Sequence, residues 1–265
     1  MPFVSLLSSG SPIIISTVFG KQIMPRNISS KVPKETSLTE KPDAIEGNAV
    51  GLPSDVAAIR KEIKSFFESP DDNGDRIGAS KWGIYAFYDY DGEPIYVGQT
   101  FEGLRSRIGR HLTNQRTDAV AMNVLDPFEV AEICVWPLAL GDLDEDEQTQ
   151  QLDRAEFTVF QKVVKESKLG AVLNEKAPRS TQSVELPKCY RKRIIPNDIF
   201  PHRKHPDTRI ARRASTIASL ARVISERKVS KGLRRTLLTQ ARRLELLAQE
   251  RLNNFPQDES ETRDD

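Results

Sequence analysis

Residues 81–115, KWGIYAFYDYDGEPIYVGQTFEGLRSRIGRHLTNQ, carry the clearest local pattern in this chain of 265 residues. Two short runs rich in aromatic and β-branched residues, 83–89 and 94–99, lie on either side of Asp91 and Gly92, a dipeptide typical of tight hairpin turns. The pattern therefore predicts a β-hairpin followed by a helix over 104–113, and we expect the rest of the fold to be organised around this unit.

The register of this hairpin decides which side chains share a face. With a loop of two or four residues, Tyr85 lies opposite Gly98 and Phe87 lies opposite Tyr96, so that all four share one face. A three-residue loop would instead separate the two tyrosines. We expect the first register. The face that we expect to be buried is the other one, which carries Ile84, Ala86, Tyr88, Ile95 and Val97.

The predicted helix over 104–113 combines an apolar stripe with basic residues. His111 falls within the stripe of Leu104, Ile108 and Leu112, and Arg107 borders it one turn before His111. Taken alone, a basic helix of this kind is most often a solvated surface, and Arg105 and Arg110 point away from the stripe or to its side.

Charge is distributed unevenly along the chain. The totals nearly balance, with 39 Lys and Arg against 38 Asp and Glu, but residues 188–251 hold eighteen basic and five acidic residues. This asymmetry indicates an anionic partner for the basic end. Cys134 and Cys189 lack metal-binding spacing, which predicts a reduced cytoplasmic protein with neither a disulfide nor zinc.

The N-terminal part divides into two segments. Residues 1–50, rich in Ser, Pro, Lys and Glu after an apolar start, are predicted to be disordered and too broken to span a membrane, and Met24 is an alternative start. Residues 51–80 are predicted to form a packing helix from about Asp55 to Glu68, with Ser54 as its N-cap, and then a loop. We expect this helix to cover one face of the sheet.

After an irregular stretch at 117–127, a third strand is predicted over 128–138, and a helix runs from the acidic loop at 142–147 to about Ser167. Glu156 lies in the middle of the apolar stripe of that helix. A carboxylate there is costly to bury without a partner, so either an arginine pairs with it or it reaches a metal ion.

The C-terminal part is predicted to contain a linker over 181–206, a basic helical hairpin over 207–255 and an acidic disordered tail over 256–265. Its helices, at about 207–227 and 232–252, have apolar stripes and densely basic outer faces. The hairpin is predicted to clamp DNA; alternatively, its apolar stripes could pair with a second copy of the chain as a homodimer.

Three ordered elements, GIY (83–85), YVG (96–98) and LRSR with Arg107, resemble the GIY-YIG nuclease superfamily. LDRAEFTVF (152–160) is similar to the helix with the family's metal-binding glutamate, at Glu156, and LNEK (173–176) to the segment with its asparagine, at Asn174. His111 matches the restriction-endonuclease branch. The resemblance covers about 81–180 as a nuclease domain. It implies an α+β fold with a small, three-stranded, mostly antiparallel sheet flanked by helices.

The resemblance also implies an activity, the metal-dependent hydrolysis of DNA phosphodiester bonds. Arg107 would contact the scissile phosphate and Tyr85 would act as base, although a free phenol has a pKa of about 10 and needs help to lose its proton. Glu156 would hold one Mg²⁺, with Mn²⁺ as an alternative, and no small-molecule cofactor is expected. The catalytic residues implied are Tyr85, Tyr96, Arg107, His111, Glu156 and Asn174. The residues expected to contact DNA phosphates are Arg107, Arg110, Arg212, Arg213, Arg234, Arg235, Arg242 and Arg243.

Three biological roles fit this sequence. The favoured one is a restriction or defence endonuclease acting on double-stranded DNA, because the nuclease stands alone with basic arms and has a histidine after the arginine. A structure-specific repair or recombination nuclease is the second. The third is a DNA-binding protein on a decayed nuclease fold. The retention of Tyr85, Tyr96, Arg107 and Glu156 argues against it, and Gln99 leaves it open because the family often has a lysine at that place.

Overall fold

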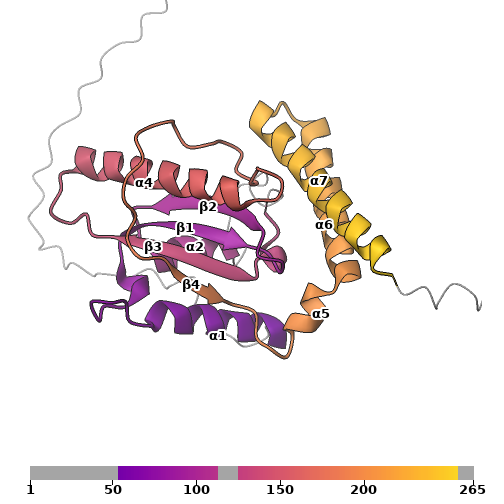
Figure 1. Cartoon of the computed structure of the whole chain (residues 1–265), viewed down its shortest axis with the longest axis horizontal. Helices are drawn as coiled ribbons and strands as arrows, with labels where there is room; N and C mark the ends of the chain where they lie inside the picture. Colours follow the sequence, from indigo (N-terminus) through magenta and orange to yellow (C-terminus); the bar gives the residue numbers. More distant parts are fainter. Residues whose placement is uncertain (1–52, 113–124, 256–265) are drawn as a thin grey trace, which may run out of the picture. The chain divides into compact units, whose positions relative to one another are not determined.

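The computed structural model describes residues 53–112 and 125–255, and within them the central element is a four-stranded antiparallel sheet with the order β2-β1-β3-β4 (Figure 1). The strands are β1 (Trp82–Tyr88), β2 (Pro94–Thr100), β3 (Glu132–Leu138) and β4 (Tyr190–Arg193). The predicted α+β class is confirmed, with one strand more than the three that were expected.

Helices cover both faces of this sheet. α1 (Ser54–Glu68) and α2 (Leu104–Leu112) pack on one face, where Phe67, Tyr85 and Ile108 belong to one buried cluster. α4 (Glu145–Glu166) packs on the opposite face (Figure 1), where Leu152 and Val159 meet Ile84 and Val97. The remaining helices are α5 (Phe200–Lys204), α6 (Pro206–Glu226) and α7 (Lys231–Asn253), and two short 3₁₀ turns lie at Ile77–Ala79 and Pro127–Glu129.

The hairpin register agrees with the prediction over most of its length. Tyr85 pairs with Gly98 and Phe87 with Tyr96, and the register then shifts between Phe87 and Tyr88. The shift leaves Ile95 in the cluster of Tyr85 rather than on the opposite face. The expectation that only the Ile84 face would be buried was wrong, because α1 and α2 also cover the Tyr85 face and leave Tyr85 and Phe87 without exposed area.

The predicted linker at 181–206 contains structure that the sequence did not indicate. β4 pairs with β3 from Glu132 opposite Arg193 to Val135 opposite Tyr190, and α5 follows before the hairpin. The sequence of β4, YRKR, has no apolar alternation because the strand lies at the mostly exposed edge of the sheet. Only its pairing with β3 defines it as a strand.

The same pairing brings the two cysteines together. Cys134 in β3 and Cys189, the residue before β4, form a disulfide with Cα atoms 6.4 Å apart. The prediction of two reduced cysteines was therefore wrong. The bond joins positions 55 residues apart. Local spacing could not reveal it, because it depends on β4 lying next to β3.

The helix boundaries agree closely with the predicted ones, but one cap differs. Ser54 was expected to cap α1, whereas the helix begins at Ser54 itself after Pro53, which makes no side-chain cap. α4 begins with a reciprocal capping box between Asp144 and Glu147. This box explains why the acidic loop leads directly into the helix that carries Glu156.

Several predictions lie outside the described residues, namely those for residues 1–50, for most of 117–127 and for 256–265. In the described ranges, no helix combines the length and the apolar character that crossing a membrane requires.

Candidate active site

The side chain of Tyr85 lies at the centre of the candidate site. Its hydroxyl group accepts a hydrogen bond from Nε of Arg107 at 3.4 Å and lies 3.0 Å from Nε2 of His111. α2 supplies both partners because residues four apart lie on the same side of a helix. The phenolic oxygen is thus held between a permanent cation and an imidazole that can exchange a proton with it.

A second tyrosine extends this cluster toward the surface. The ring of Tyr96 lies 6.2 Å from that of Tyr85 and 5.4 Å from that of His111, and Tyr96 is only partly buried. Gly98 makes this arrangement possible, because a Cβ atom there would lie 2.5 Å from the Tyr85 hydroxyl oxygen. The predicted pairing of Tyr85 with Gly98 is confirmed, and the glycine leaves room for the Tyr85 ring.

Glu156 faces the same region from α4. Its pKa is raised to about 7, mainly by burial and in addition by the nearby carboxylate of Asp153, while Arg107 opposes the shift. Burial lowers the pKa of Arg107, but Tyr85, Tyr96 and Glu156 more than offset this, and the net pKa is raised. Arg107 on α2 thus interacts electrostatically both with the two tyrosines of the hairpin and with Glu156 on α4.

Two residues beside Glu156 were not assigned a role from the sequence. The side-chain amide of Gln99, where the family often has a lysine, donates a hydrogen bond to Oδ1 of Asp153 at 3.1 Å. Asp153 lies one turn before Glu156 on α4. The three-residue spacing between Asp153 and Glu156 was the sign in the sequence that both carboxylates lie on the same side of the helix. Gln99 therefore holds a second carboxylate next to Glu156 without adding a positive charge.

Asn174 acts on the backbone of β2 rather than on the Tyr85 cluster directly. Its side chain accepts a hydrogen bond from the Val97 nitrogen at 3.0 Å and donates one to the Val97 oxygen at 2.7 Å. Val97 lies between Tyr96 and Gly98, on the outer edge of the sheet. Asn174 thus fixes the strand that positions both residues.

The arginines of α2 remain accessible. The Arg107 side chain is 37% exposed, and its Nη1 atom lies 3.7 Å from Oε1 of Glu102, with which Arg110 also forms an ion pair. A single exposed carboxylate screens these cations only weakly. Both guanidinium groups can therefore meet an anionic ligand.

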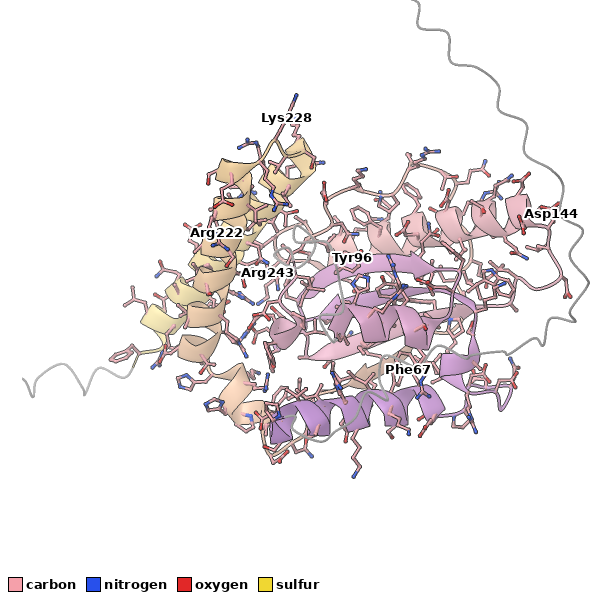
Figure 2. The ribbon with its side chains drawn as sticks, turned by 180° about the vertical axis from the view of Figure 1, so that it is seen from behind. Phe67, Tyr96, Asp144, Arg222, Lys228 and Arg243 are labelled. Atoms are coloured by element: carbon pink, nitrogen blue, oxygen red, sulfur yellow. A yellow bond between two sulfur atoms is a disulfide. The ribbon has the colours of Figure 1, made fainter. Side chains whose placement is uncertain are left out.

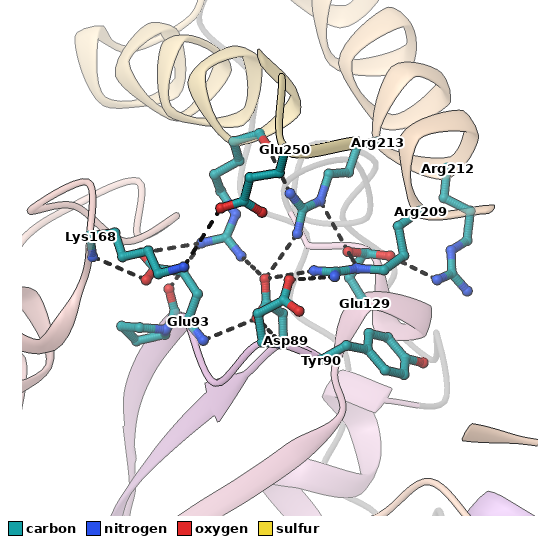
Figure 3. Close-up of polar contacts among 12 residues, drawn as sticks. Asp89, Tyr90, Glu93, Glu129, Lys168, Arg209, Arg212, Arg213 and Glu250 are labelled. Carbon is teal, nitrogen blue, oxygen red and sulfur yellow. Dashed lines mark hydrogen bonds and ion pairs between the residues drawn. The ribbon is translucent and has the colours of Figure 1, made fainter. Parts of the chain in front are cut away.

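The arginines of the C-terminal hairpin do not form one group. Arg213 and Arg243 are buried and bind Oδ2 of Asp89 at 2.9 and 2.7 Å, and Arg209 binds the same atom at 3.0 Å (Figure 3). The predicted placement of Arg213 and Arg243 on an outer, DNA-contacting face was wrong, because these faces of α6 and α7 pack against the turn between β1 and β2.

The other predicted hairpin arginines differ in exposure. Arg212 is partly buried and binds Oε1 of Glu129 at 2.9 Å. Arg234, Arg235 and Arg242 are exposed. Asp89 and Glu129 were not singled out in the sequence, which gives no local sign of the helix that approaches them.

The donor atoms of the site fit one divalent cation with few protein ligands. Within residues 53–112 and 125–255, no group of three or more His, Cys, Asp or Glu side chains could enclose a metal ion. Glu156 offers a carboxylate whose pKa is raised by burial and by the neighbouring carboxylate of Asp153. Such a site suits Mg²⁺, which binds oxygen ligands and keeps several waters.

The structure places a tyrosine pair on a short antiparallel sheet, an arginine on the next helix and a glutamate on a later helix. This is the order of elements that the resemblance to a class of nucleases implies. Residues 81–138 match the family model of the GIY-YIG catalytic domain. The chain therefore contains a domain of the GIY-YIG nuclease superfamily, as predicted. The match spans β1, β2, α2 and β3, and ends before Glu156 and Asn174. No curated protein and no solved structure matches the chain.

Proposed function

We propose that this protein is a metal-dependent endonuclease that hydrolyses phosphodiester bonds in double-stranded DNA. The observation that carries the proposal is the Tyr85 hydroxyl group, held between Arg107 and His111 in a domain that matches the GIY-YIG model. A buried tyrosine needs one hydrogen-bond partner, and this one has both a cation and a proton acceptor. Packing alone does not call for that arrangement.

Tyr85 would prepare the attacking water. Its hydroxyl proton would pass to Nε2 of His111, and Arg107 would stabilise the phenolate oxygen that remains. That oxygen would then take a proton from the water as the water attacks phosphorus. Tyr96, partly exposed beside Tyr85, would help to orient the water and the phosphate.

Arg107 would bind the scissile phosphate. Its Nε atom is used by Tyr85, whereas its terminal nitrogens lie at the exposed end of the side chain. A guanidinium group stays charged at working pH and can donate two parallel hydrogen bonds to a phosphate. Asn174 would act as a positioning residue by holding β2 at Val97.

Glu156 would hold the divalent cation, with Asp153 beside it. When bound, Mg²⁺ or Mn²⁺ neutralises charge on the phosphate and on the leaving oxygen. Glu156 must be deprotonated to bind it, and its pKa of about 7 makes this binding sensitive to pH near neutrality.

The tip of the helical hairpin would hold DNA near this site. Ser230 at the start of α7 donates a hydrogen bond to Oε1 of Glu175 at 2.7 Å, and Glu175 follows Asn174. Arg227, Lys228 and Lys231 are exposed around that turn, and Figure 2 shows Lys228 projecting from it. Contacts between such cations and phosphates give affinity that falls steeply with salt.

The favoured biological role is a restriction or defence enzyme, and substrate choice separates it from a repair enzyme. We expect discrete fragments from plain duplex DNA. Cleavage confined to flaps or junctions would assign the protein to repair or recombination instead.

The test is incubation of the purified full chain with duplex DNA and Mg²⁺. We expect cleavage by the parent protein and by Glu145→Gln, a control at an exposed carboxylate in the first turn of α4. Glu156→Gln should lose cleavage while it keeps the parent's circular dichroism spectrum. Equal cleavage by Glu156→Gln and the parent would reject the assignment.

A further inference from the structure

The hairpin of α6 and α7 has two faces of opposite character. The face toward the sheet is filled: Arg209, Arg213 and Arg243 bind Asp89 there (Figure 3), and Leu220 and Leu233 are buried in the core cluster. Arg243 also donates a hydrogen bond to the Pro94 oxygen at 3.1 Å. The hairpin is thereby fixed to the catalytic domain through this face, and the opposite face remains exposed.

On α6, the exposed face carries a stripe of alanines, bordered by the exposed Arg222. Ala211, Ala214, Ala218 and Ala221 are all exposed and recur at spacings of three, four and three residues. At about 100° per residue they occupy an arc of roughly 80°. A surface helix normally places charged residues on its solvent side, so an exposed alanine stripe of three turns is unusual.

On α7, a matching stripe contains leucines as well as alanines. Leu238 is 52% exposed and Leu252 is 70% exposed, and Ala241 and Ala248 lie exposed between them. Large apolar side chains with this exposure, repeated along one face of a helix, are typical of a surface that binds another protein.

The two stripes lie on the same side of the hairpin. Around the axis of α6, Ile217 and Ile224 lie between Arg213 and the alanine stripe. Around the axis of α7, Leu237 and Leu244 lie between Arg243 and the exposed stripe. The isoleucines and leucines are partly buried in the seam between the helices. The two stripes therefore border that seam on the side away from the ionic network.

We propose that this outer face binds the same face of a second copy of the chain, so that two hairpins form a four-helix bundle in a homodimer. A twofold interface requires a surface that is complementary to itself. Within the α7 stripe, the charged residues are Arg234 and Glu245, which lie three turns apart. If the α7 helices of the two copies run antiparallel, Arg234 of one copy lies opposite Glu245 of the other, and Leu238 lies opposite Ala241. The twofold axis repeats each of these pairs.

DNA is a poor occupant for this face. Phosphate binding needs an excess of cations, whereas the stripe holds one positive and one negative side chain. The cations Lys231, Arg235 and Arg242 occupy a separate arc of α7, next to the stripe. Self-association and DNA binding can thus use different surfaces of the same helix. This proposal does not depend on the proposed nuclease activity.

The experiment is light scattering on the full chain after size exclusion, over a range of concentrations. We expect a species of twice the 29.8 kDa chain mass. Ala218→Glu and Leu238→Glu should each raise the dissociation constant of the dimer by about tenfold or more, because each buries a charge without a partner. Ser215→Glu and Leu246→Glu, at exposed positions outside the stripes, should leave the dimer intact.

A charge exchange tests the pairing itself. Arg234→Glu and Glu245→Arg should each weaken the dimer, and the double variant should restore it, since the pair is then reversed. Circular dichroism checks that every variant folds. A parent protein that stays monomeric at all concentrations would overturn the proposal, and so would a dimer that Ala218→Glu and Leu238→Glu leave unchanged.

Discussion

Arginine has two opposite roles in this molecule, one on α2 and one on the C-terminal hairpin. The Arg107 side chain is 37% exposed and contacts the Tyr85 hydroxyl group and the Glu102 carboxylate. Arg213 and Arg243 are 6% and 4% exposed, and both bind Asp89. The first leaves donors for a ligand, whereas the second pair uses its donors within the protein. The number of arginines in a segment is therefore a poor measure of its capacity to bind DNA.

The carboxylates around the hairpin arginines explain this difference. Asp89 is buried, accepts hydrogen bonds from the backbone nitrogens of Asp91 and Glu93, and binds three guanidinium groups. Asp91 and Glu129 contribute further ion pairs. One aspartate thus organises the β1–β2 turn and anchors the C-terminal helices to it.

We expect the largest effect from replacing an arginine by lysine, which keeps the positive charge, first at the exposed Arg107 and then at the buried Arg213. Arg107→Lys should lower the cleavage rate by about 10³-fold, because lysine cannot reproduce the bidentate phosphate contact. Its stability should stay close to that of the parent. Initial rates with duplex DNA and urea unfolding measure the two quantities.

The matched variant is Arg213→Lys, which should lose stability and keep the cleavage rate of the folded protein. If Arg213→Lys lost cleavage while its unfolding curve stayed unchanged, the division between the two groups would be wrong.

The next effect concerns the carboxylate that the hairpin arginines share. Asp89→Asn should lower the free energy of unfolding by about 3–5 kcal/mol, because three buried guanidinium groups lose their common anion. Urea unfolding followed by circular dichroism measures it. Asp146→Asn, at an exposed site in the first turn of α4, is the control and should change stability by less than about 0.5 kcal/mol. Equal stabilities for the two variants would contradict the buried network.

A smaller effect is expected for the pH dependence of stability at Glu156. Asp89 binds three guanidinium groups, whereas Arg107 is the cation that acts on Glu156. The pKa of Glu156 is raised from 4.5 to about 7 in the folded protein. The folded state then holds the proton more tightly than the unfolded state. Without divalent cations, the free energy of unfolding should fall as the pH rises between these two values.

The measurement is a series of unfolding curves across that pH window in the presence of a chelator. Glu156→Gln should remove this part of the pH dependence. Mg²⁺ should also reduce the loss of stability, because it binds the deprotonated form. A parent and a Glu156→Gln variant with the same pH profile would contradict the raised pKa.

The smallest effect belongs to the exposed arginines of α7. Arg235→Ala or Arg242→Ala should weaken DNA binding modestly and lower the slope of log affinity against log salt by about 1 each. Fluorescence anisotropy at several salt concentrations gives the slope. An unchanged slope in the double variant would place the DNA elsewhere on the protein.

The predictions of local geometry that the structure confirms rest on short-range spacing. The spacing around Asp91 and Gly92 sets the hairpin register, so Tyr85 faces Gly98. Helical periodicity puts Arg107 and His111 on the same side of α2. The partners of Arg213 and Arg243 were missed because Asp89 is more than 120 residues away in the chain. No local pattern relates residues at that separation.

The sequence by itself determined the order of α1, β1, β2, α2, β3, α4, α6 and α7, the hairpin register that sets Tyr85 opposite Gly98, and the resemblance carried by GIY, YVG and Arg107. The order and the register follow from backbone periodicity and turn chemistry. The tertiary structure alone decided that 190–193 is a strand, that Cys134 meets Cys189, and that some hairpin arginines are buried while others are exposed. The physical reason is that an ion pair, a disulfide and an edge strand each need a partner, and the partner's place depends on how the whole chain packs.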